Sequence, residues 1–252
     1  RFLDRIYIKD ILLNGSSATE ARAYDLRKPK ESKELDETIN RILLSGNPDK
    51  ALAEKAFTFC TLVNTAGAWS HRVSEMYGFY ADEVKPRRRQ MVVLDCPDVD
   101  LSSYGMIIDT SDIYFHKEAA NILAGYSNMD EPYGYNLEFS FGGTDEDSPF
   151  VKYIWGPLWH RMSGFERIKF IRGWAGIYAE TPDRSGYLGK VKGLDNVYEC
   201  AGHTGRGLMI SYGAGCALAD LMLDGGFRAG LAHAADLSRE RPSGDLYEGL
   251  HL

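Results

Sequence analysis

The apolar positions near the start of the chain have the spacing of two strands. Residues 2–13 form a strand-like apolar run, 14–17 (NGSS) has the composition of a turn, and 21–26 suits a return strand. We therefore predict a strand pair over 1–26.

The next stretch, 27–50, is charged and interrupts the apolar pattern. Within it, Leu and Ile recur at helical spacing after Ser32 and stop before Gly46, so the pattern predicts a short helix with Ser32 as its cap. We interpret 27–50 as a surface insertion. A solvated excursion is favoured over a regulatory or partner-binding element.

Residues 51–85 have the pattern of a strand, a turn of small residues and a helix. The apolar run 56–63 predicts one continuous buried strand, and the helix passes through Val73 and Tyr77 before Gly78. The segment between them is NTAGAWS, at 64–70. Its small side chains would let a ligand or a neighbouring strand come close to the backbone.

From Pro86 to about 178 the period changes to two residues, as in half-buried strands. The predicted strands are 90–94, 106–109, 113–116, 121–126 and 165–178, with 106–116 forming a hairpin around 110–112. A polar, Gly- and Pro-containing stretch at 127–149 predicts a loop, and 150–162 has helical periodicity. The prediction is an antiparallel sheet with a covering helix.

A glycine-rich turn follows at 202–209, with the sequence GHTGRGLM. It ends a strand-like run at 197–201 and opens a helix-like run at 208–222. A helix start offers unpaired N–H groups and a partial positive charge, which suits a flat, electron-rich or anionic ligand. The alternative is a tight turn without a ligand, since GxxGxG differs from the dinucleotide fingerprint GxGxxG.

Composition and charge narrow the class of protein. The 252 residues are 44% apolar with a net charge of −7, which argues against a nucleic-acid surface. No apolar run approaches the roughly 18 residues of a transmembrane segment. The four cysteines are far apart and predict neither a disulfide framework nor a metal site. Reduced thiols suit a cytoplasmic or mitochondrial compartment.

Both ends of the chain raise expectations about what surrounds it. The first residue is Arg1 and a strand-like run follows directly, so we expect an upstream segment or a separate polypeptide that completes the fold. The tail 229–252 is charged, with little periodicity, and is interpreted as a peripheral C-terminal extension or docking arm.

Four segments in this order carry a family resemblance: NTAGAWS (64–70), PRRRQMVVL (86–94), WAGIYAETPDRSGYLGKV (174–191) and YECAGHTGRGLMISYGAGCALADLML (198–223). Together they resemble the C-terminal two thirds of the FAD-dependent amine and amino-acid oxidoreductases of the D-amino-acid oxidase and sarcosine oxidase superfamily. The likeness covers about 56–228.

The resemblance implies an α/β (α+β) fold in which an incomplete Rossmann-like FAD-binding domain is interleaved with an antiparallel-sheet substrate domain. Residues 1–26 would lie at the junction of the two domains. The FAD domain would take 51–85 and, as its closing strand and helix, 179–228. The substrate domain would be 86–178.

The same resemblance implies an FAD site with two sides. Ala66, Gly67 and Trp69 would lie along the cofactor. The pyrimidine edge of the flavin would meet Gly202, His203, Thr204, Gly205, Arg206, Gly207, Leu208 and Met209. The residues supply a reason, because reduced flavin carries negative charge at N1 and O2, which a helix start stabilises.

Three features depart from the family pattern. The strand–GxGxxG–helix that binds the FAD pyrophosphate is not in this sequence, so upstream sequence or a partner chain would have to supply it. Met209 stands where the sarcosine-oxidase branch has a lysine. The segment 178–186 contains no cysteine, so the resemblance implies non-covalent FAD.

The catalytic residues remain open, with Tyr114, His116 and Arg206 as candidates. Tyr114 and His116 share one face of their strand, where substrate binding competes with a favoured structural role. Arg206 would neutralise a carboxylate or the flavin edge, or form a surface ion pair. His203 is either a flavin contact or a turn histidine. For Arg87–Arg89, a charged strand entrance is favoured over carboxylate binding. Core packing is the favoured role for Trp155, Trp159 and Trp174.

Two functions follow. The first is an FAD-dependent oxidoreductase that removes a hydride from the C–N bond of a small amine or amino acid. The alternative is a catalytically degenerate, flavoprotein-like accessory or assembly subunit of a mitochondrial respiratory complex. Under both we expect a protein partner or an N-terminal half, and a mitochondrial location is favoured over the cytoplasm.

Overall fold

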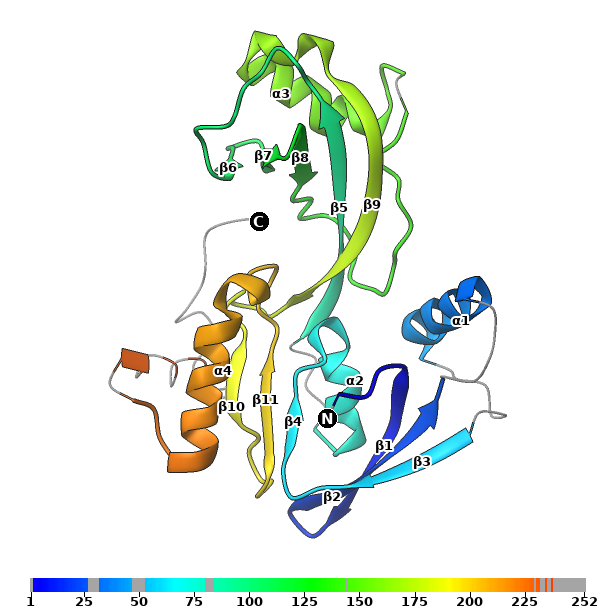
Figure 1. Ribbon diagram of the computed structural model, residues 1–252, viewed down its shortest axis with the longest axis vertical. Coiled ribbons are helices and arrows are strands. Elements are labelled where there is room, and N and C mark those ends of the chain that lie inside the picture. Colours follow the sequence, from blue (N-terminus) through cyan, green and yellow to red (C-terminus); the bar gives the residue numbers. More distant parts are fainter. Residues whose placement is uncertain are drawn as a thin grey trace. The chain divides into compact units, whose positions relative to one another are not determined.

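The computed structural model describes residues 2–26, 32–46, 53–79, 84–143, 145–228, 230, 231, 234 and 237, and the side chains of 32–36 are set aside. The chain divides into two compact units (Figure 1). Among the described residues, unit one is built from those up to Pro86 and those from Tyr178 onward, and unit two from Arg87–Ile177. Each unit is described on its own.

The first sheet of unit one contains β1 (Ile6–Asn14), β2 (Ser17–Asp25) and β3 (Ala53–Thr58). Both pairs of neighbours are antiparallel, in the order β1-β2-β3. The β1–β2 hairpin confirms the strand pair expected from the apolar runs. Gly15, with φ +62°, forms the turn, because glycine adopts positive φ without steric cost.

The expected short helix exists as α1 (Ser32–Ser45), and Gly46 ends it with φ +74°. Over 37–45, α1 has one buried position among exposed and half-buried ones, so one face of this surface segment is packed. Ile42 is fully buried in a cluster with Tyr24 and Leu26, so α1 packs on the first sheet. The rest of 27–50 lies outside the described residues.

The second sheet of unit one has the order β10-β11-β4. Its strands are β10 (Tyr187–Lys190), β11 (Val197–Ala201) and β4 (Leu62–Asn64). The prediction of one continuous buried strand over 56–63 is wrong. The chain leaves the first sheet at Thr58 and enters the second at Leu62, and its partners change from antiparallel β2 to parallel β11.

Three helices of unit one agree with the expected strand–turn–helix pattern. A single turn, η1 (Gly67–Trp69), leads into α2 (Ser70–Met76), which contacts β1 and β4. The helix α4 (Gly207–Asp224) contacts β10 and β11 and ends at Gly225, which has φ +72° (Figure 1). None of the helices in the described ranges is long and apolar enough to cross a membrane.

Unit two is a five-stranded antiparallel sheet in the order β6-β7-β8-β5-β9. The strands are β5 (Lys85–Asp95), β6 (Ile107–Ile108), β7 (Ile113–Glu118), β8 (Asn121–Tyr126) and β9 (Lys169–Glu180). One face packs on a helical segment, η2 (Val151–Trp155) followed by α3 (Gly156–Arg161). The expected sheet with one covering helix is present.

Two details of unit two differ from the pattern. The last strand begins at Lys169 because Ser163–Arg167 forms a separate turn, η3, with Phe165 fully buried. The prediction of core tryptophans is wrong for Trp159 and Trp174, which are 47% and 43% exposed. Their apolar spacing matches a core face, but within the described chain nothing covers these two side chains completely.

Candidate functional site

Two small-residue segments far apart in the sequence adjoin in unit one. Strands β4 and β11 are parallel, with Leu62 opposite Val197 and Asn64 opposite Glu199. We call 64–70 the small-residue corner and 202–207 the glycine turn. Each begins where its strand ends, so both lie at the carboxyl edge of the same sheet, the usual ligand position in such folds.

Asn64 builds the small-residue corner. Its side-chain amide donates to the Ser70 carbonyl at 2.9 Å and to the Tyr77 hydroxyl at 3.1 Å, and its Oδ1 accepts the Ala66 N–H at 3.2 Å. The side chain is 2% exposed. One buried amide therefore joins the strand end, the corner and helix α2.

Gly67 is the open position of this corner. Its φ is +56°, and no described heavy atom lies within 4 Å of where a Cβ would be. The Ser70 hydroxyl holds the Gly67 carbonyl at 2.7 Å. A fixed backbone with open space beside it is what the close approach of a ligand needs.

The glycine turn contains a strained residue. Gly202 and Gly205 have φ of +78° and +81°, but Thr204 between them also has φ +45°. A left-handed β-branched residue is a genuine outlier and costs about 1–3 kcal/mol. The Thr204 N–H donates to the Ala179 carbonyl at 2.9 Å, and its hydroxyl donates to the Gly202 carbonyl at 3.1 Å.

Helix α4 starts directly after this turn. Arg206 is its N-cap, and within the described chain no side chain caps the helix. The first intrahelical bond shown runs from the Ile210 N–H to the Arg206 carbonyl. The N–H groups of Gly207, Leu208 and Met209 thus belong to an uncapped first turn, which attracts negative charge.

His203 is held from two sides by protein. Its Nε2 lies 3.2 Å from the Cys200 Sγ, and its buried Nδ1 faces Gly186, where a Cβ would lie 2.2 Å away. Burial, and then Arg206, lowers the pKa of His203, although the Ser185 backbone acts in the opposite direction. Burial and the Glu199 charge raise the pKa of the Cys200 thiol. A neutral turn histidine fits this geometry best.

Arg206 and the loop 181–186 lock together. The Arg206 guanidinium donates to the Arg184 carbonyl. Asp183 orders the loop, because its Oδ1 accepts the Thr181 hydroxyl at 2.9 Å and the Ser185 N–H at 3.1 Å. Asp183 therefore fixes the loop. The catalytic candidate Arg206 makes a structural contact.

The two other catalytic candidates, Tyr114 and His116, belong to unit two. They lie on the face of β7 opposite to its core residues Ile113 and Phe115. Tyr114 pairs with Gly125 on β8, where a Cβ would lie 2.5 Å from the Tyr114 hydroxyl oxygen. The Tyr114 ring can therefore occupy this position only because residue 125 is a glycine.

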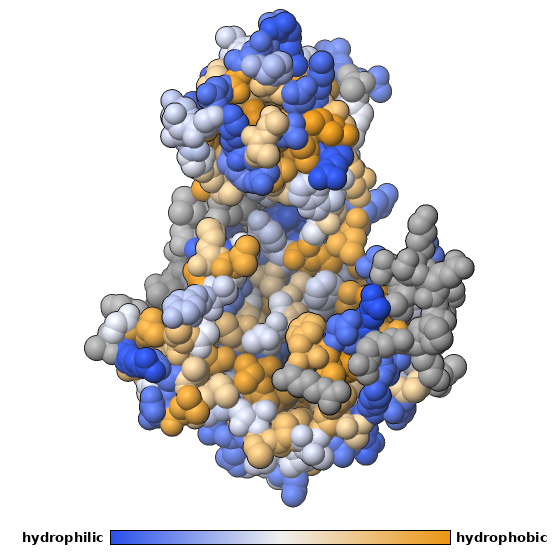
Figure 2. All heavy atoms as spheres, viewed as in Figure 1, coloured by the Kyte–Doolittle hydropathy of each residue, from blue (hydrophilic) through white to orange (hydrophobic). Residues whose placement is uncertain are grey.

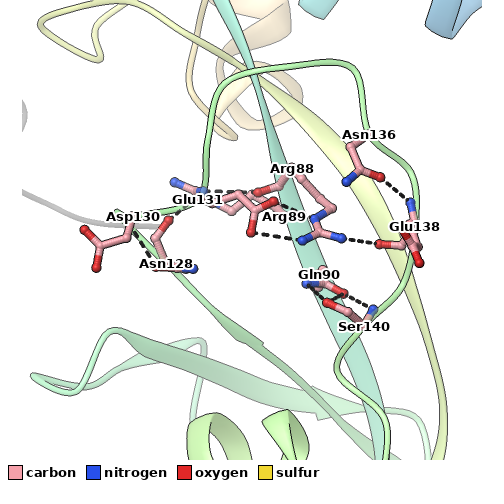
Figure 3. A network of polar contacts seen from close by, with 9 residues as sticks. All are labelled: Arg88, Arg89, Gln90, Asn128, Asp130, Glu131, Asn136, Glu138 and Ser140. Carbon is pink, nitrogen blue, oxygen red and sulfur yellow. Dashed lines mark hydrogen bonds and ion pairs between the residues drawn. The ribbon is translucent and has the colours of Figure 1, made fainter.

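The arginine run holds a loop of unit two (Figure 3). Arg88 makes a bidentate contact with the Glu131 carboxylate, at 2.6 and 3.2 Å, and donates to the Glu138 carbonyl at 2.7 Å. Arg87 stacks on the Tyr133 ring at 4.1 Å, and Arg89 donates to the Asn128 carbonyl at 3.2 Å. The three side chains fix 128–138 to β5.

An isoalloxazine ring suits the residues of unit one. Gly67 offers open space, the glycine turn places its backbone in a left-handed nest, and the first turn of α4 is uncapped. These three features at one sheet edge match the chemistry of a planar group that takes up negative charge.

Comparison with known proteins gives this architecture a family. The family model described as "FAD dependent oxidoreductase" (DAO) matches residues 25–221. The chain belongs to the DAO family of FAD-dependent oxidoreductases, and FAD is the cofactor that this membership indicates. The resemblance seen in the four motifs is confirmed.

Relatives and solved structures agree with this assignment. FAD-dependent oxidoreductase domain-containing protein 1 of Xenopus laevis is 35% identical over 185 residues, covering 67% of this chain and 36% of the relative. Its Mus musculus counterpart is 29% identical over 197 residues, covering 71% and 39%. The chain therefore spans just over a third of these relatives.

Solved structures show the same fold at low identity. L-proline dehydrogenase from P. horikoshii superposes with a TM-score of 0.66 at 18% identity, covering 91% of this chain and 52% of that one. Glycine oxidase from Geobacillus kaustophilus gives 0.58 at 22% identity, covering 76% and 49%. The expected α/β (α+β) fold class is confirmed.

Sequence reasoning missed three residues of this site: Asn64, Arg72 and Cys200. Asn64 was visible as the polar residue that ends an apolar strand, and Cys200 as the first residue of a Cys-x-x-His spacing. Arg72 left no sequence signal, because its partners lie 28 and 29 residues away in α1.

Proposed function

We propose that this chain forms the C-terminal part of an FAD-dependent oxidoreductase that removes a hydride from the C–N bond of a small amine or amino acid. The observation that carries the proposal is the adjacency of the small-residue corner and the glycine turn at one sheet edge. Bound FAD would supply the hydride acceptor. Family membership supports the reaction class, and the amine substrate rests on the resemblance.

The residues of this chain would hold the cofactor without a covalent bond. Ala66 and Gly67 would lie along it, and the backbone of 202–207 would meet its pyrimidine edge. The uncapped first turn of α4 would stabilise negative charge there by its N–H groups. Met209 brings no charge of its own, so the positive potential would come from the helix start and from Arg206, its N-cap residue.

The proposal extends to a completing half. Strand β4 pairs with β11, and β10-β11-β4 is the whole order of that sheet within the described chain. A sheet edge of this kind invites another strand. A strand–GxGxxG–helix half, from upstream sequence or a partner chain, would add the pyrophosphate site that this chain does not carry.

The test is spectroscopic and uses the full-length protein. We expect flavin absorbance at about 450 nm and FAD released on denaturation, followed by bleaching when amines or amino acids are added without oxygen. Absence of FAD from the intact assembly would refute the proposal. FAD without bleaching by any amine or amino acid would refute the substrate class only.

An accessory role is the second candidate, and an exposed apolar surface favours it. Leu208, Met209 and Tyr212 at the start of α4 are 89%, 69% and 86% exposed. Figure 2 shows apolar residues at several places on the surface of unit one. Large exposed apolar groups of this kind mark protein contacts. An assembly subunit of a mitochondrial respiratory complex would use such a surface, and complex levels after L208D/Y212D would test it.

A further inference from the structure

The C-terminus of α1 is closed by Trp69 of the small-residue corner and by Arg72 of helix α2. Arg72 donates to the Leu43 carbonyl at 2.6 Å and to the Leu44 carbonyl at 2.9 Å. The Trp69 indole Nε1 donates to the Leu43 carbonyl at 2.8 Å. We call these three hydrogen bonds the α1 latch.

The latch supplies what α1 lacks. The last turn of α1 contains no basic residue, although a helix C-terminus has a partial negative charge that a cation stabilises. Arg72 provides that cation from α2. Its guanidinium also lies against Gly46, where a Cβ would sit 3.4 Å from Arg72 Cζ, which is ordinary van der Waals contact.

The far side of α1 is anchored to the first sheet. Ile42 is fully buried beside Tyr24 and Leu26, and the Tyr7 hydroxyl donates to the Gly46 carbonyl at 3.2 Å. The helix is therefore fixed on one side by packing and on the other by the latch. It connects the first sheet of unit one to the corner that leaves the second sheet.

The corner has little slack between the latch and Gly67. Trp69 ends the single turn η1, which begins at Gly67, and its N–H donates to the Ala66 carbonyl at 3.0 Å. The Ser70 hydroxyl holds the Gly67 carbonyl at 2.7 Å. A shift of Trp69 or Arg72 would therefore move the backbone of Ala66 and Gly67.

We infer that the α1 latch sets the position of the FAD-facing corner, which makes Arg72 and Trp69 positioning residues for cofactor binding. The inference rests on the proposed function. It also changes the role expected for Trp69, whose indole N–H is bound to α1, so this donor serves the latch. Whatever holds or displaces α1 would then alter FAD affinity from a distance.

The experiment measures the corner with and without cofactor in the full-length protein. R72Q removes both Arg72 bonds, R72K restores the charge and one donor, and W69F removes only the indole N–H. R22Q is the matched control, since Arg22 lies on β2 of the same unit and pairs with Glu20 on the surface. Hydrogen exchange of 64–70 and the Kd for FAD are the two readouts.

We expect R72Q to raise exchange in 64–70 of the cofactor-free protein about tenfold and to weaken FAD binding about tenfold. W69F should show a smaller change and R72K a partial rescue, while R22Q matches the wild type. I42V, which loosens α1 from the opposite side, should increase exchange in 64–70 as well.

The outcomes separate the two proposals. Faster exchange in α1 with unchanged exchange in 64–70 would overturn the latch, as would altered exchange with unchanged FAD affinity. Wild-type protein that binds no FAD would defeat the proposed function, whereas the exchange data on cofactor-free protein would still decide whether the latch sets the corner.

Discussion

Asn64 and Glu199 lie opposite each other in the parallel pair β4–β11, and both side chains are 2% exposed. Each is the last or nearly the last residue before a small-residue turn. Two buried polar side chains thus mark the edge at which the corner and the glycine turn begin. Because parallel strands end at the same edge, this register brings Gly67 and Gly205 into one region of unit one.

Replacing Asn64 should destabilise the protein more than replacing an exposed asparagine does. N64A would leave the Ser70 carbonyl and the Ala66 N–H without their side-chain partner. We expect a loss of about 2 kcal/mol in the free energy of urea unfolding. N40A, on the exposed face of α1, should change it by less than about 0.5 kcal/mol. Equal effects of the two substitutions would contradict the role of Asn64.

The protein should be more stable with glycine at position 204 than with alanine there. T204A loses the hydroxyl bond to Gly202 but keeps a Cβ at φ +45°, so we expect a loss of about 1 kcal/mol. T204G loses the same bond and relieves a strain of about 1–2 kcal/mol, so its stability should match or exceed that of the wild type. Thermal unfolding of both variants tests the order, and the reverse order would exclude strain at Thr204.

Gly205 of the glycine turn and Gly67 of the small-residue corner should respond differently to replacement by alanine. G205A places a Cβ 2.5 Å from the Tyr178 ring at φ +81°, and we expect a loss of about 3 kcal/mol. G67A meets open space at φ +56° and should cost about 1 kcal/mol. Chemical unfolding measures both.

Under the proposed function G67A has a second consequence. Its methyl group would occupy the space beside the corner, so FAD binding should weaken in a protein that remains folded. An FAD titration of full-length G67A at a temperature where it is fully folded decides this. Wild-type affinity in that variant would remove Gly67 from the cofactor site.

The stability of unit one should depend on pH through His203. Because burial lowers the pKa of His203 in the folded protein, the unfolded chain binds more protons near and below pH 6.5. Stability is therefore fully present above pH 6.5 and falls as the pH drops through the lowered pKa. H203Q should flatten the dependence of the urea-unfolding midpoint on pH between pH 7 and 5, and an unchanged pH dependence in that variant would contradict the role of His203.

The cysteines should differ in reactivity. Cys60 is exposed, whereas burial raises the pKa of Cys96 and of Cys200, which also contacts His203. Because the thiolate is the reactive form, iodoacetamide at neutral pH should label Cys60 first. Mass spectrometry of the native protein measures the order. Labelling of Cys200 as fast as Cys60 would contradict the buried thiol–imidazole pair.

The sequence by itself determined the elements that depend on local backbone preference and on the period of apolar residues. The hairpin around Gly15, the ends of α1 at Gly46 and of α4 at Gly225, and the alternating strands of unit two all follow from neighbours along the chain. The four motifs also indicated the family, because they lie in the family's order.

Only the tertiary structure decided where the apolar residues around 56–63 go. The run contains no glycine or proline that would mark a break. Even so, β3 and β4 belong to different sheets, because β3 pairs with β2 and β4 pairs with β11. The sequence also did not reveal that Trp159 and Trp174 are exposed, because apolar spacing shows which side chains share a face but not whether another element covers that face.

The latch and the inward-facing His203 were also beyond sequence reasoning. Arg72 meets carbonyls 28 and 29 residues away, and backbone carbonyls carry no sequence signature. The sequence left His203 open between a flavin contact and a turn histidine, because its neighbours Cys200 and Gly186 are fixed by the folding of β11 against the loop 181–186. Local backbone preference determines the helices and strands, whereas long-range packing determines which partners Arg72 and His203 meet.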